Sequence, residues 1–392
     1  MKTTFYEPDK LSTFLASKKT LLARGAISQV GLEAKKLGAT RALVVTDAGL
    51  TKAGLAAEVE RILGEAGLEV GMFDGILPEP PSGVIDQCAG VFRQGNYDLC
   101  LGLGGGSSLD SAKIVSVLAN NPGSVVDYVG LDLVPNKGAP LILVPTTAGT
   151  GSEATRVMVF TDDSDNTKKV VLSDFLLPDL AVLDPELTLS VPPAVTADTG
   201  MDALVHAIET YVSVNTTPYA EILSLQAIAM IAKHLPQAYA KGSNLLARYN
   251  MLLAANLSGS AFASGGLGAV HGLAYILGTE YHMSHGRSNA IMLPHVMSYN
   301  LTGNLEKYAN IAEAMGEETM GLSPYEAAAL SVDAVYSLMD AVNLSAKLGD
   351  YGISSEDLPK LVAGGMAQAR LFVPNPRDLT EADVEQIYAS AF

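Results

Sequence analysis

Residues 99–110, LCLGLGGGSSLD, set the architecture of the first half of the chain. The segment begins with apolar residues typical of a buried strand and ends with residues that favour the start of a helix. Because the glycines at 104–106 carry no side chain, a phosphate group can approach the backbone N–H groups there. Ser107 and Ser108 can cap the helix, whose N-terminus carries partial positive charge. The segment therefore predicts a strand, a phosphate-binding turn and a helix.

Short apolar runs alternate with helix-length amphipathic runs on both sides of this segment. The predicted strands are residues 42–46, 69–73, 99–103, 141–144 and 180–183. The helices predicted between them are residues 49–66, 83–94 and 107–120. Strands separated by helices of this length indicate a parallel sheet with crossover helices.

The glycine-rich turn departs from the usual nucleotide-binding fingerprints. Ser107 stands where the Rossmann pattern has a third glycine, and the Lys-Ser/Thr ending of a P-loop is missing. Asp47 ends the predicted strand 42–46, where its carboxylate can bind an adenosine ribose and repel a 2′-phosphate. Such an acid usually follows the glycines by about 20 residues, whereas here it precedes them. We therefore expect a dinucleotide site whose topology is not the standard one.

A second polar loop, residues 145–153 (PTTAGTGSE), follows the predicted strand 141–144 directly. Its four hydroxyl groups and two glycines predict a polar clamp for a cofactor. Serine and threonine are also ordinary helix caps, so a purely structural role stays open.

The pattern changes at residues 183–198 (LDPELTLSVPPAVTAD), where three prolines interrupt the chain. Long helical patterns rich in Ala, Leu and Met follow, at residues 220–234, 245–263, 308–315 and 324–338. We place the domain boundary at about residue 187. The sequence thus predicts an α/β dinucleotide-binding domain (1–187) and an all-α domain (188–392).

Asp202 and His206 lie four residues apart in a segment, 201–214, that has helical periodicity and no Gly or Pro. At that spacing both side chains leave the same face of a helix, one turn apart. The pair can supply two ligands to one divalent metal ion.

Two more histidines, His271 and His285, lie fourteen residues apart further along the chain. A continuous helix would separate them by about 21 Å, whereas metal–His bonds are about 2.0–2.1 Å. Shared ligation therefore needs a turn between them, and Gly278 and Gly286 are the expected helix breakers. One carboxylate and three imidazoles would leave room for a substrate oxygen, as in catalytic sites. On the residues alone, histidines that are merely packed in the core remain an equal alternative.

Composition narrows the classes of protein. The formal net charge of −17 over 392 residues argues against a nucleic-acid partner and suits an enzyme of small molecules. Cys88 and Cys100 lie in apolar segments and imply no disulfide framework, which suits a reducing cytoplasm. The N-terminus has no apolar signal region, and no stretch approaches 18 uninterrupted apolar residues. We expect a cytoplasmic protein without membrane segments, and helices that offer surface for a homodimer or larger homo-oligomer.

Taken together, these segments resemble the iron-dependent (group III) alcohol dehydrogenase family along essentially the whole chain. The motifs that carry the resemblance are VTDAG, GLGGGSSLDSAK, PTTAGTGSEATR, TGMDALVHAIETY, GLGAVHGLAY, SHGRSNAIMLPHV and NPRDLTEADVEQIY. The resemblance implies a dehydroquinate synthase-like fold, with an N-terminal dinucleotide domain, a C-terminal helical domain and the site between them.

The resemblance also implies roles for individual residues. The implied metal ligands are Asp202, His206, His271 and His285. The implied pyrophosphate loop comprises Gly104, Gly105, Gly106 and Ser107, and the same motif adds Asp110 to the cofactor site. The implied nicotinamide-side loop comprises Thr146, Thr147, Thr150 and Ser152. Lys168 resembles a lysine that holds the ribose, and Asp47 resembles the ribose-binding acid of NAD-preferring members.

One position departs from the family pattern. Many members have a second histidine one turn after the first metal-binding one, and it is thought to pass a proton to solvent. Tyr275 occupies that position here. Its reference pKa of about 10, against about 6.5 for histidine, makes it a poorer relay at neutral pH. His282 is the alternative relay.

The sequence therefore predicts an NAD(H)-linked alcohol dehydrogenase or aldehyde reductase acting on small primary alcohols or aldehydes. Fe(II) is the expected metal and Zn(II) suits the same ligands. Arg156 and Arg287 could bind an anionic tail, so a sulfoacetaldehyde- or succinic semialdehyde-type substrate is a second candidate; ion pairing within the protein is their other role. A dehydroquinate synthase-like lyase and a non-enzymatic helical oligomer remain further alternatives.

Overall fold

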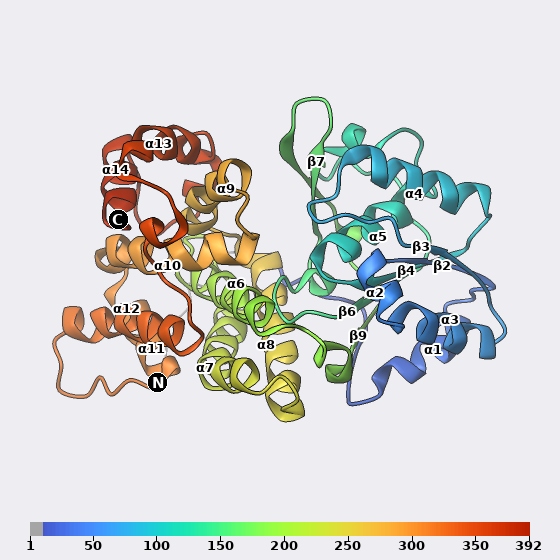
Figure 1. Ribbon diagram of the computed structural model, residues 1–392, viewed down its shortest axis with the longest axis horizontal. Coiled ribbons are helices and arrows are strands. Elements are labelled where there is room, and N and C mark those ends of the chain that lie inside the picture. Colours follow the sequence, from blue (N-terminus) through green and yellow to red (C-terminus); the bar gives the residue numbers. More distant parts are fainter. Residues whose placement is uncertain (1–10) are drawn as a thin grey trace. The chain divides into compact units, whose positions relative to one another are not determined.

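A computed structural model describes residues 11–392 (Figure 1). The chain forms two compact units: Leu15–Ser190, and Val191–Phe392 together with residues 11–14. The first unit contains both sheets and the second is helical. Each unit is described separately below.

A six-stranded parallel sheet forms the centre of the first unit, with the strand order β1-β9-β6-β4-β2-β3. Its strands are β1 (Thr20–Leu22), β2 (Arg41–Val45), β3 (Glu69–Phe73), β4 (Leu99–Gly104), β6 (Leu141–Pro145) and β9 (Leu180–Leu183). The predicted parallel sheet is confirmed.

Helices cover both faces of this sheet, as Figure 1 shows. They are α1 (Val30–Lys36), α3 (Leu55–Glu65), α4 (Ser82–Gln94) and α5 (Gly106–Leu118). Because successive strand side chains point to opposite faces, Ala42 and Val44 of β2 pack with α1 and α3, whereas Leu43 and Val45 pack with α4 and α5. Strands buried on both faces explain the near-continuous apolar runs in the sequence.

Several elements of this unit differ from the prediction, and β1 and α1 were not predicted. The single helix expected over residues 49–66 is two helices, α2 (Ala48–Lys52) and α3, because Gly54 between them has a φ of +83°. A further unpredicted feature is an antiparallel hairpin of β7 (Val157–Asp162) and β8 (Thr167–Leu172). It joins β5 (Gly130–Leu131) in a separate three-stranded sheet.

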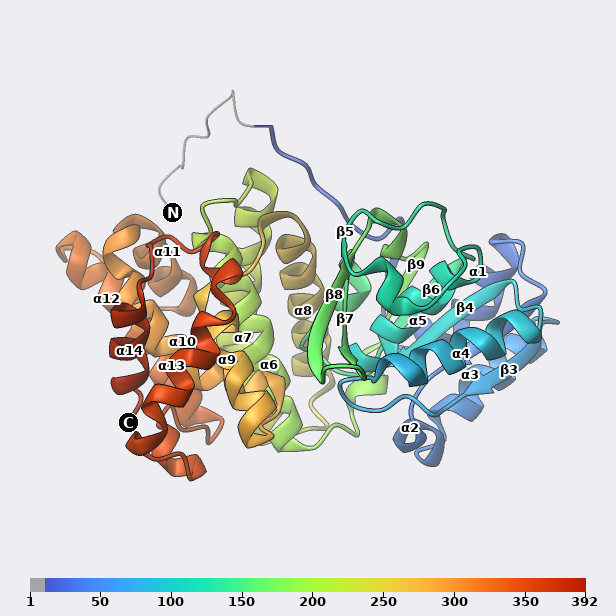
Figure 2. The same ribbon diagram turned by 90° about the horizontal axis from the view of Figure 1, so that it is seen from above.

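The second unit contains only helices within its described residues, as predicted. They are α6 (Pro193–Val212), α7 (Pro218–Ala240), α8 (Leu245–Gly265), α9 (Ala269–Tyr281), α10 (His285–Asn300), α11 (Leu305–Met315), α12 (Pro324–Ala341), α13 (Leu358–Met366) and α14 (Glu381–Ala389). Helices α6, α7 and α8 pack against one another (Figure 2). Buried residues occupy almost all of α6 from Gly200 onwards, so this helix lies in the core of the unit.

Among the described residues, no individual helix has the length and apolar character required to cross a membrane. One strongly bent pair, α8 with α9, meets those criteria when the two helices are taken together.

Candidate functional site

Asp202 and His206 lie on the same face of α6, one turn apart, as their spacing predicts. Both side chains are buried. His206 is stacked between the ring of Phe262, at a centroid distance of 5.3 Å, and the ring of His271, at 4.9 Å. This packing fixes the plane of the His206 imidazole.

His271 lies in the first turn of α9, and His285 is the first residue of α10. The chain turns between them at His282, which has a φ of +55° and ends α9. The prediction that Gly278 and Gly286 break the helix is wrong, because each lies inside a helix. A left-handed residue does not have to be glycine, and here a histidine takes that conformation.

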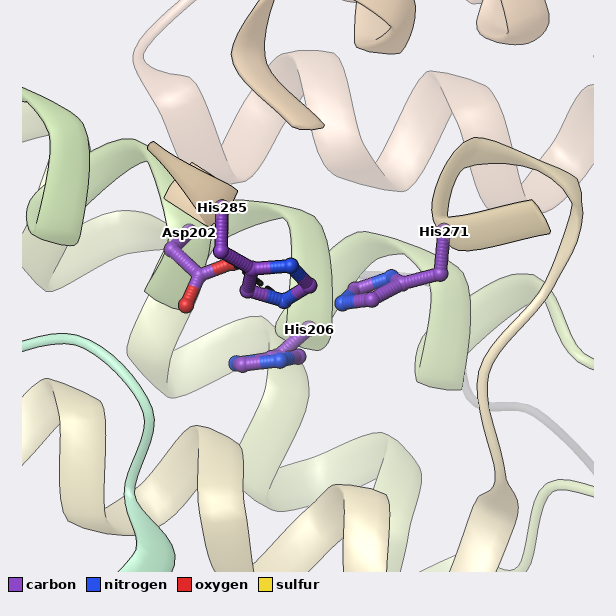
Figure 3. A group of neighbouring side chains, drawn as sticks. All are labelled: Asp202, His206, His271 and His285. Carbon is purple, nitrogen blue, oxygen red and sulfur yellow. Dashed lines mark ion pairs between the residues drawn. The ribbon is translucent and has the colours of Figure 1, made fainter. Parts of the chain in front are cut away.

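The four side chains converge on one point (Figure 3). One ligand atom from each of Asp202, His206, His271 and His285 can be chosen so that all lie within 4.8 Å of one another. Two atoms bound to the same ion are at most about 4.2 Å apart, given metal–nitrogen bonds of about 2.1 Å. The group therefore needs only a small contraction to hold one divalent ion.

Charge at this cluster also suits a cation. Burial by itself would raise the pKa of Asp202, but His206, His285 and His271, with a hydrogen bond from Asn289, hold that pKa below its ordinary value. The carboxylate is therefore ionised at neutral pH. One anionic and three imidazole ligands, largely shielded from water, match the chemistry of Fe(II) and Zn(II) equally.

Asn289 is a residue of this cluster that the sequence analysis missed. It lies on α10 one turn after His285 and is completely buried. Its Nδ2 lies 2.8 Å from Oδ1 of Asp202 and 3.1 Å from Nε2 of both His271 and His285. Its Oδ1 is buried and accepts no hydrogen bond from any described residue. The spacing of four residues from His285 on a helix was the available signal.

Gly286 brings the first turn of α10 close to α6. A β-carbon on Gly286 would lie 2.2 Å from the carbonyl oxygen of Asp198 and 3.2 Å from Cβ of Asp202. Any larger residue would push α10 away. The glycine therefore allows the close approach that places His285 beside Asp202, and it does not serve as a helix breaker.

The two predicted proton-relay residues occupy different positions. Tyr275 lies on α9 one turn after His271, and its ring centroid is 6.2 Å from that of His285. His282 is exposed and forms the turn that ends α9. Both roles stay predictions, and the position beside the cluster favours Tyr275.

The glycine-rich turn connects β4 to the N-terminus of α5, as predicted. Gly104 has a φ of +149°, and a β-carbon on it would lie 2.8 Å from Cβ of Ser108. A β-carbon on Gly106 would lie 2.8 Å from Cγ2 of Thr150, and one on Gly105 would lie 3.5 Å from Oγ1 of Thr147. The two predicted cofactor loops are therefore in contact.

Asp110 and Lys113 of α5 hold these loops together. The Ser152 hydroxyl donates to Oδ1 of Asp110 at 2.5 Å, and the backbone N–H of Val159 donates to Oδ2 at 3.0 Å. Lys113 is wholly buried and donates to Asp110, to Oγ1 of Thr155 and to the carbonyl oxygen of Val157. The cofactor-binding role of Asp110 stays a prediction. The hydrogen bonds described here join its side chain to other residues of the protein. The role of Lys113 was missed.

Two further predicted cofactor residues are linked to the glycine-rich turn by polar contacts. Thr146 follows β6, and its N–H donates to the carbonyl oxygen of Gly104. Lys168, on β8, forms an ion pair with Glu79, whose backbone N–H donates to Oγ of Ser107. Each role stays a prediction, but these contacts link Lys168 to the glycine-rich loop.

Asp47 follows β2 and caps α2 by accepting hydrogen bonds from the N–H groups of Gly49 and Leu50. Strands β2 and β4 are parallel neighbours, so Asp47 and the glycine-rich turn lie at the same carboxyl edge of the sheet. This strand order explains how an acid that precedes the glycines in sequence can serve the same dinucleotide.

Both arginines considered for an anionic substrate form ion pairs. Arg156 contacts Asp174 at 2.7 Å and Asp132 at 3.5 Å. Arg287 contacts Asp198 at 3.0 Å. Their positive charges are therefore partly compensated within the protein.

Two protein-family models match this chain. A family model described as iron-containing alcohol dehydrogenase matches residues 17–185. A second model, described as the C-terminal part of the Fe-containing alcohol dehydrogenase family, matches residues 196–392. The two matches cover nearly the whole chain.

Individual relatives are similar over almost their full length. Long-chain-alcohol dehydrogenase 1 of Geobacillus thermodenitrificans (strain NG80-2) is 43% identical, over 94% of this chain and 93% of the relative. The NAD-dependent methanol dehydrogenase of Bacillus methanolicus is 37% identical, over 97% of this chain and all of the relative. A crystal structure of 1,3-propanediol oxidoreductase superposes with a TM-score of 0.95 at 39% identity, covering 98% of this chain and all of that one. With matches of this extent on both halves, the chain belongs to the iron-containing alcohol dehydrogenase family.

Proposed function

We propose that this oxidoreductase transfers hydride between NAD(H) and a small primary alcohol or aldehyde, with the help of one divalent metal ion. The observation that carries the proposal is the convergence of Asp202, His206, His271 and His285 within 4.8 Å. Three separate helices contribute to that cluster, which core packing alone would not require. We assign the helical unit to the metal and the unit Leu15–Ser190 to the dinucleotide.

The four ligand residues would hold Fe(II), with Zn(II) as the alternative. When bound, such an ion acts as a Lewis acid toward the oxygen of an alcohol or aldehyde. Asp202 contributes the single negative charge of the ligand set, and burial of the cluster strengthens its electrostatic interactions. The stacking of His206 on Phe262 and His271 reduces the reorganisation needed for binding.

The loops at the carboxyl edge of the sheet would bind NAD(H). The N–H groups of the glycine-rich turn and the N-terminus of α5 suit the pyrophosphate. The polar loop 145–153 is in contact with that turn and would bind the nicotinamide half of the cofactor. Lys168 would bind a ribose. Asp47 would favour NAD over NADP, because its charge repels a 2′-phosphate. Bound nicotinamide supplies the hydride chemistry.

Tyr275 is the proposed proton relay between the substrate oxygen and solvent. Its place beside His285 supports this assignment. Its hydroxyl can both donate and accept a hydrogen bond, as a relay must.

Small neutral substrates are favoured over anionic aldehydes, because Arg156 and Arg287 are already paired with carboxylates. A lyase of the dehydroquinate synthase type is disfavoured by the match of both halves to alcohol dehydrogenase models. A non-enzymatic helical oligomer is disfavoured because it would need neither the ligand cluster nor the two loops.

We also propose a cytoplasmic location and a homo-oligomeric state, a dimer or larger. Cys88 and Cys100 are free and buried, which suits a reducing compartment. Exposed apolar side chains on the helical unit, including Tyr219, Ile222 and Leu246, support association of subunits.

The direct test is NADH oxidation by the purified protein with a panel of short aldehydes, both neutral and anionic. The proposal predicts turnover with neutral aldehydes, and turnover much weaker with NADPH. Absence of turnover with every aldehyde, with the protein loaded with Fe(II) or Zn(II), would contradict it. A preference for sulfoacetaldehyde or succinic semialdehyde would support the proposed hydride transfer but would show that the substrates are anionic and not neutral aldehydes.

A further inference from the structure

The two ring nitrogens of His271 have different partners. Nδ1 lies 2.6 Å from Oε2 of Glu209. Nε2 lies 3.1 Å from Nδ2 of Asn289, within the ligand cluster. The contact with Glu209 therefore lies on the side of the ring away from the nitrogen that would bind a metal ion.

Glu209 is held rigidly in this position. It lies on α6 one turn after His206, and its side chain is buried. Its Oε1 accepts hydrogen bonds from the backbone N–H groups of Val270, at 2.6 Å, and His271, at 3.4 Å. These N–H groups belong to the first turn of α9, whose N-cap residue, Gly268, supplies no side-chain cap. The Glu209 carboxylate thus takes the place of a helix cap, and the partial positive charge at the N-terminus of α9 stabilises it.

Gly268 makes room for this carboxylate. A β-carbon there would lie 3.1 Å from Oε1 of Glu209, tighter than an ordinary contact. The backbone at the start of α9 and the side chain of Glu209 therefore fit each other closely.

These contacts determine the tautomer of His271. A carboxylate that receives two backbone N–H groups on one oxygen acts as an acceptor, so Nδ1 of His271 donates to the other oxygen. The contact with Glu209 therefore places the proton on Nδ1 and directs the lone pair of Nε2 into the ligand cluster. On that side of the ring, the neighbouring amide nitrogen of Asn289 offers no acceptor for a proton on Nε2, which agrees with this tautomer.

We propose that Glu209 is a positioning residue of the metal centre: it fixes the ring and tautomer of His271 and thereby raises the affinity for the divalent ion. The inference rests on the metal site proposed above and adds Glu209 to it. A carboxylate on the far nitrogen of a ligating histidine orients the ring and increases its basicity. Loss of such a partner typically weakens metal binding by about 10–100-fold.

The test uses the zinc-loaded protein and a competing chelator, with the chelator concentration that removes half of the zinc as the readout. Glu209→Gln should lose zinc at a chelator concentration about 10–100-fold lower than the wild type. Glu221→Gln is the matched control, since Glu221 is 6% exposed against 5% for Glu209 and forms an ion pair with Lys307 away from the cluster. The control should retain zinc as the wild type does.

A second readout separates positioning from general destabilisation. Replacing zinc with Co(II) gives a visible absorption spectrum that depends on the ligands. The spectrum should change in Glu209→Gln and stay the same in Glu221→Gln. Zinc affinity and a cobalt spectrum in Glu209→Gln that both equal the wild type would overturn the proposal.

If Glu209→Gln does not fold, Glu209→Asp decides by the same criteria, because a side chain shorter by one carbon keeps the charge and loses reach. A wild-type protein that takes up no zinc at all would instead contradict the metal site itself. The two failures are therefore distinguishable.

Discussion

Gly286 approaches Asp198 so closely that a β-carbon on the glycine would lie 2.2 Å from the Asp198 carbonyl oxygen. This contact joins the first turn of α10 to α6, the two helices that carry His285 and Asp202. A backbone contact outside the ligand set therefore controls the distance between two of the ligands.

Gly286→Ala should accordingly weaken the metal centre. The added methyl group would have to push α10 away from α6, which we expect to cost about 1–3 kcal/mol of stability. Metal content after dialysis against a weak chelator should fall, and the thermal midpoint should fall with it. Gly278→Ala is the control, since a β-carbon there meets its nearest neighbour at 3.6 Å in the interior of α9. An alanine at 286 that leaves metal content unchanged would contradict this account.

Asp47→Asn should relax the preference for NADH. Asparagine keeps a side-chain oxygen for the cap of α2 but removes the charge that repels a 2′-phosphate. We expect the ratio of kcat/KM for NADPH to that for NADH to rise about tenfold, equivalent to ~1.4 kcal/mol. Steady-state kinetics with both cofactors measure this ratio. If it does not change, Asp47 does not select the cofactor.

Lys113→Met should destabilise the first unit and weaken NAD(H) binding. The substitution leaves Asp110, Thr155 and the carbonyl of Val157 without a buried donor, at a cost of about 3–5 kcal/mol. Chemical unfolding and NADH fluorescence titration report the two effects. Lys169→Met, at a lysine paired with Asp165 near the surface, is the control and should change neither. Unaltered NADH affinity in a folded Lys113 variant would show that the two loops do not need this link.

Tyr275→Phe should lower kcat near neutral pH while leaving the metal content intact, because the hydroxyl is lost and the ring is kept. His282→Asn should have little effect, since asparagine tolerates the positive φ that ends α9. The pH dependence of kcat for both variants is the measurement. The opposite result, with His282→Asn slow and Tyr275→Phe normal, would transfer the relay to His282.

Asp179 should contribute to acid sensitivity of the first unit. Burial alone would raise its pKa, but Lys18, the N–H of Leu141 and Lys137 together hold the pKa below its ordinary value. A lowered pKa in the folded state means that the stabilisation is complete above the ordinary value, about 3.9, and is lost as pH falls through the lower folded value. Unfolding free energies of Asp179→Asn should therefore show less loss than the wild type below about pH 4. If the unfolding free energies of Asp179→Asn and the wild type fall equally as the pH is lowered, Asp179 does not have this role.

Strand positions followed closely from the sequence because parallel strands are buried on both faces. Residues 180–183 are predicted and observed with the same limits because they form a fully buried apolar run. The limits of residues 69–73 also match, although Glu69 is exposed and the rest of this edge strand is only half-buried. The hairpin β7–β8 was missed, although Met158 and Phe160 alternate with more exposed residues and Asn166 has a positive φ in the turn. Its alternation was the signal for a strand with one buried face.

The residues around the candidate site were less predictable than its ligands. The pairing of Asp202 with His206 follows from helical spacing. The approach of His271 to His285 depends instead on a turn at His282, and histidine is not a residue from which a turn is predicted. Glu209 and Asn289 act through contacts between helices that are distant in sequence. Helical spacing places Asn289 on the same face as His285, but it does not show that Asn289 reaches Asp202 or that Glu209 reaches His271.

The most direct test of the account is the metal content of freshly purified wild-type protein beside that of His271→Ala. The account predicts about one iron or zinc ion per wild-type chain, and a variant that is folded but nearly free of metal. Wild-type protein that holds no metal after exposure to Fe(II) or Zn(II), or a variant that holds as much as the wild type, would contradict it.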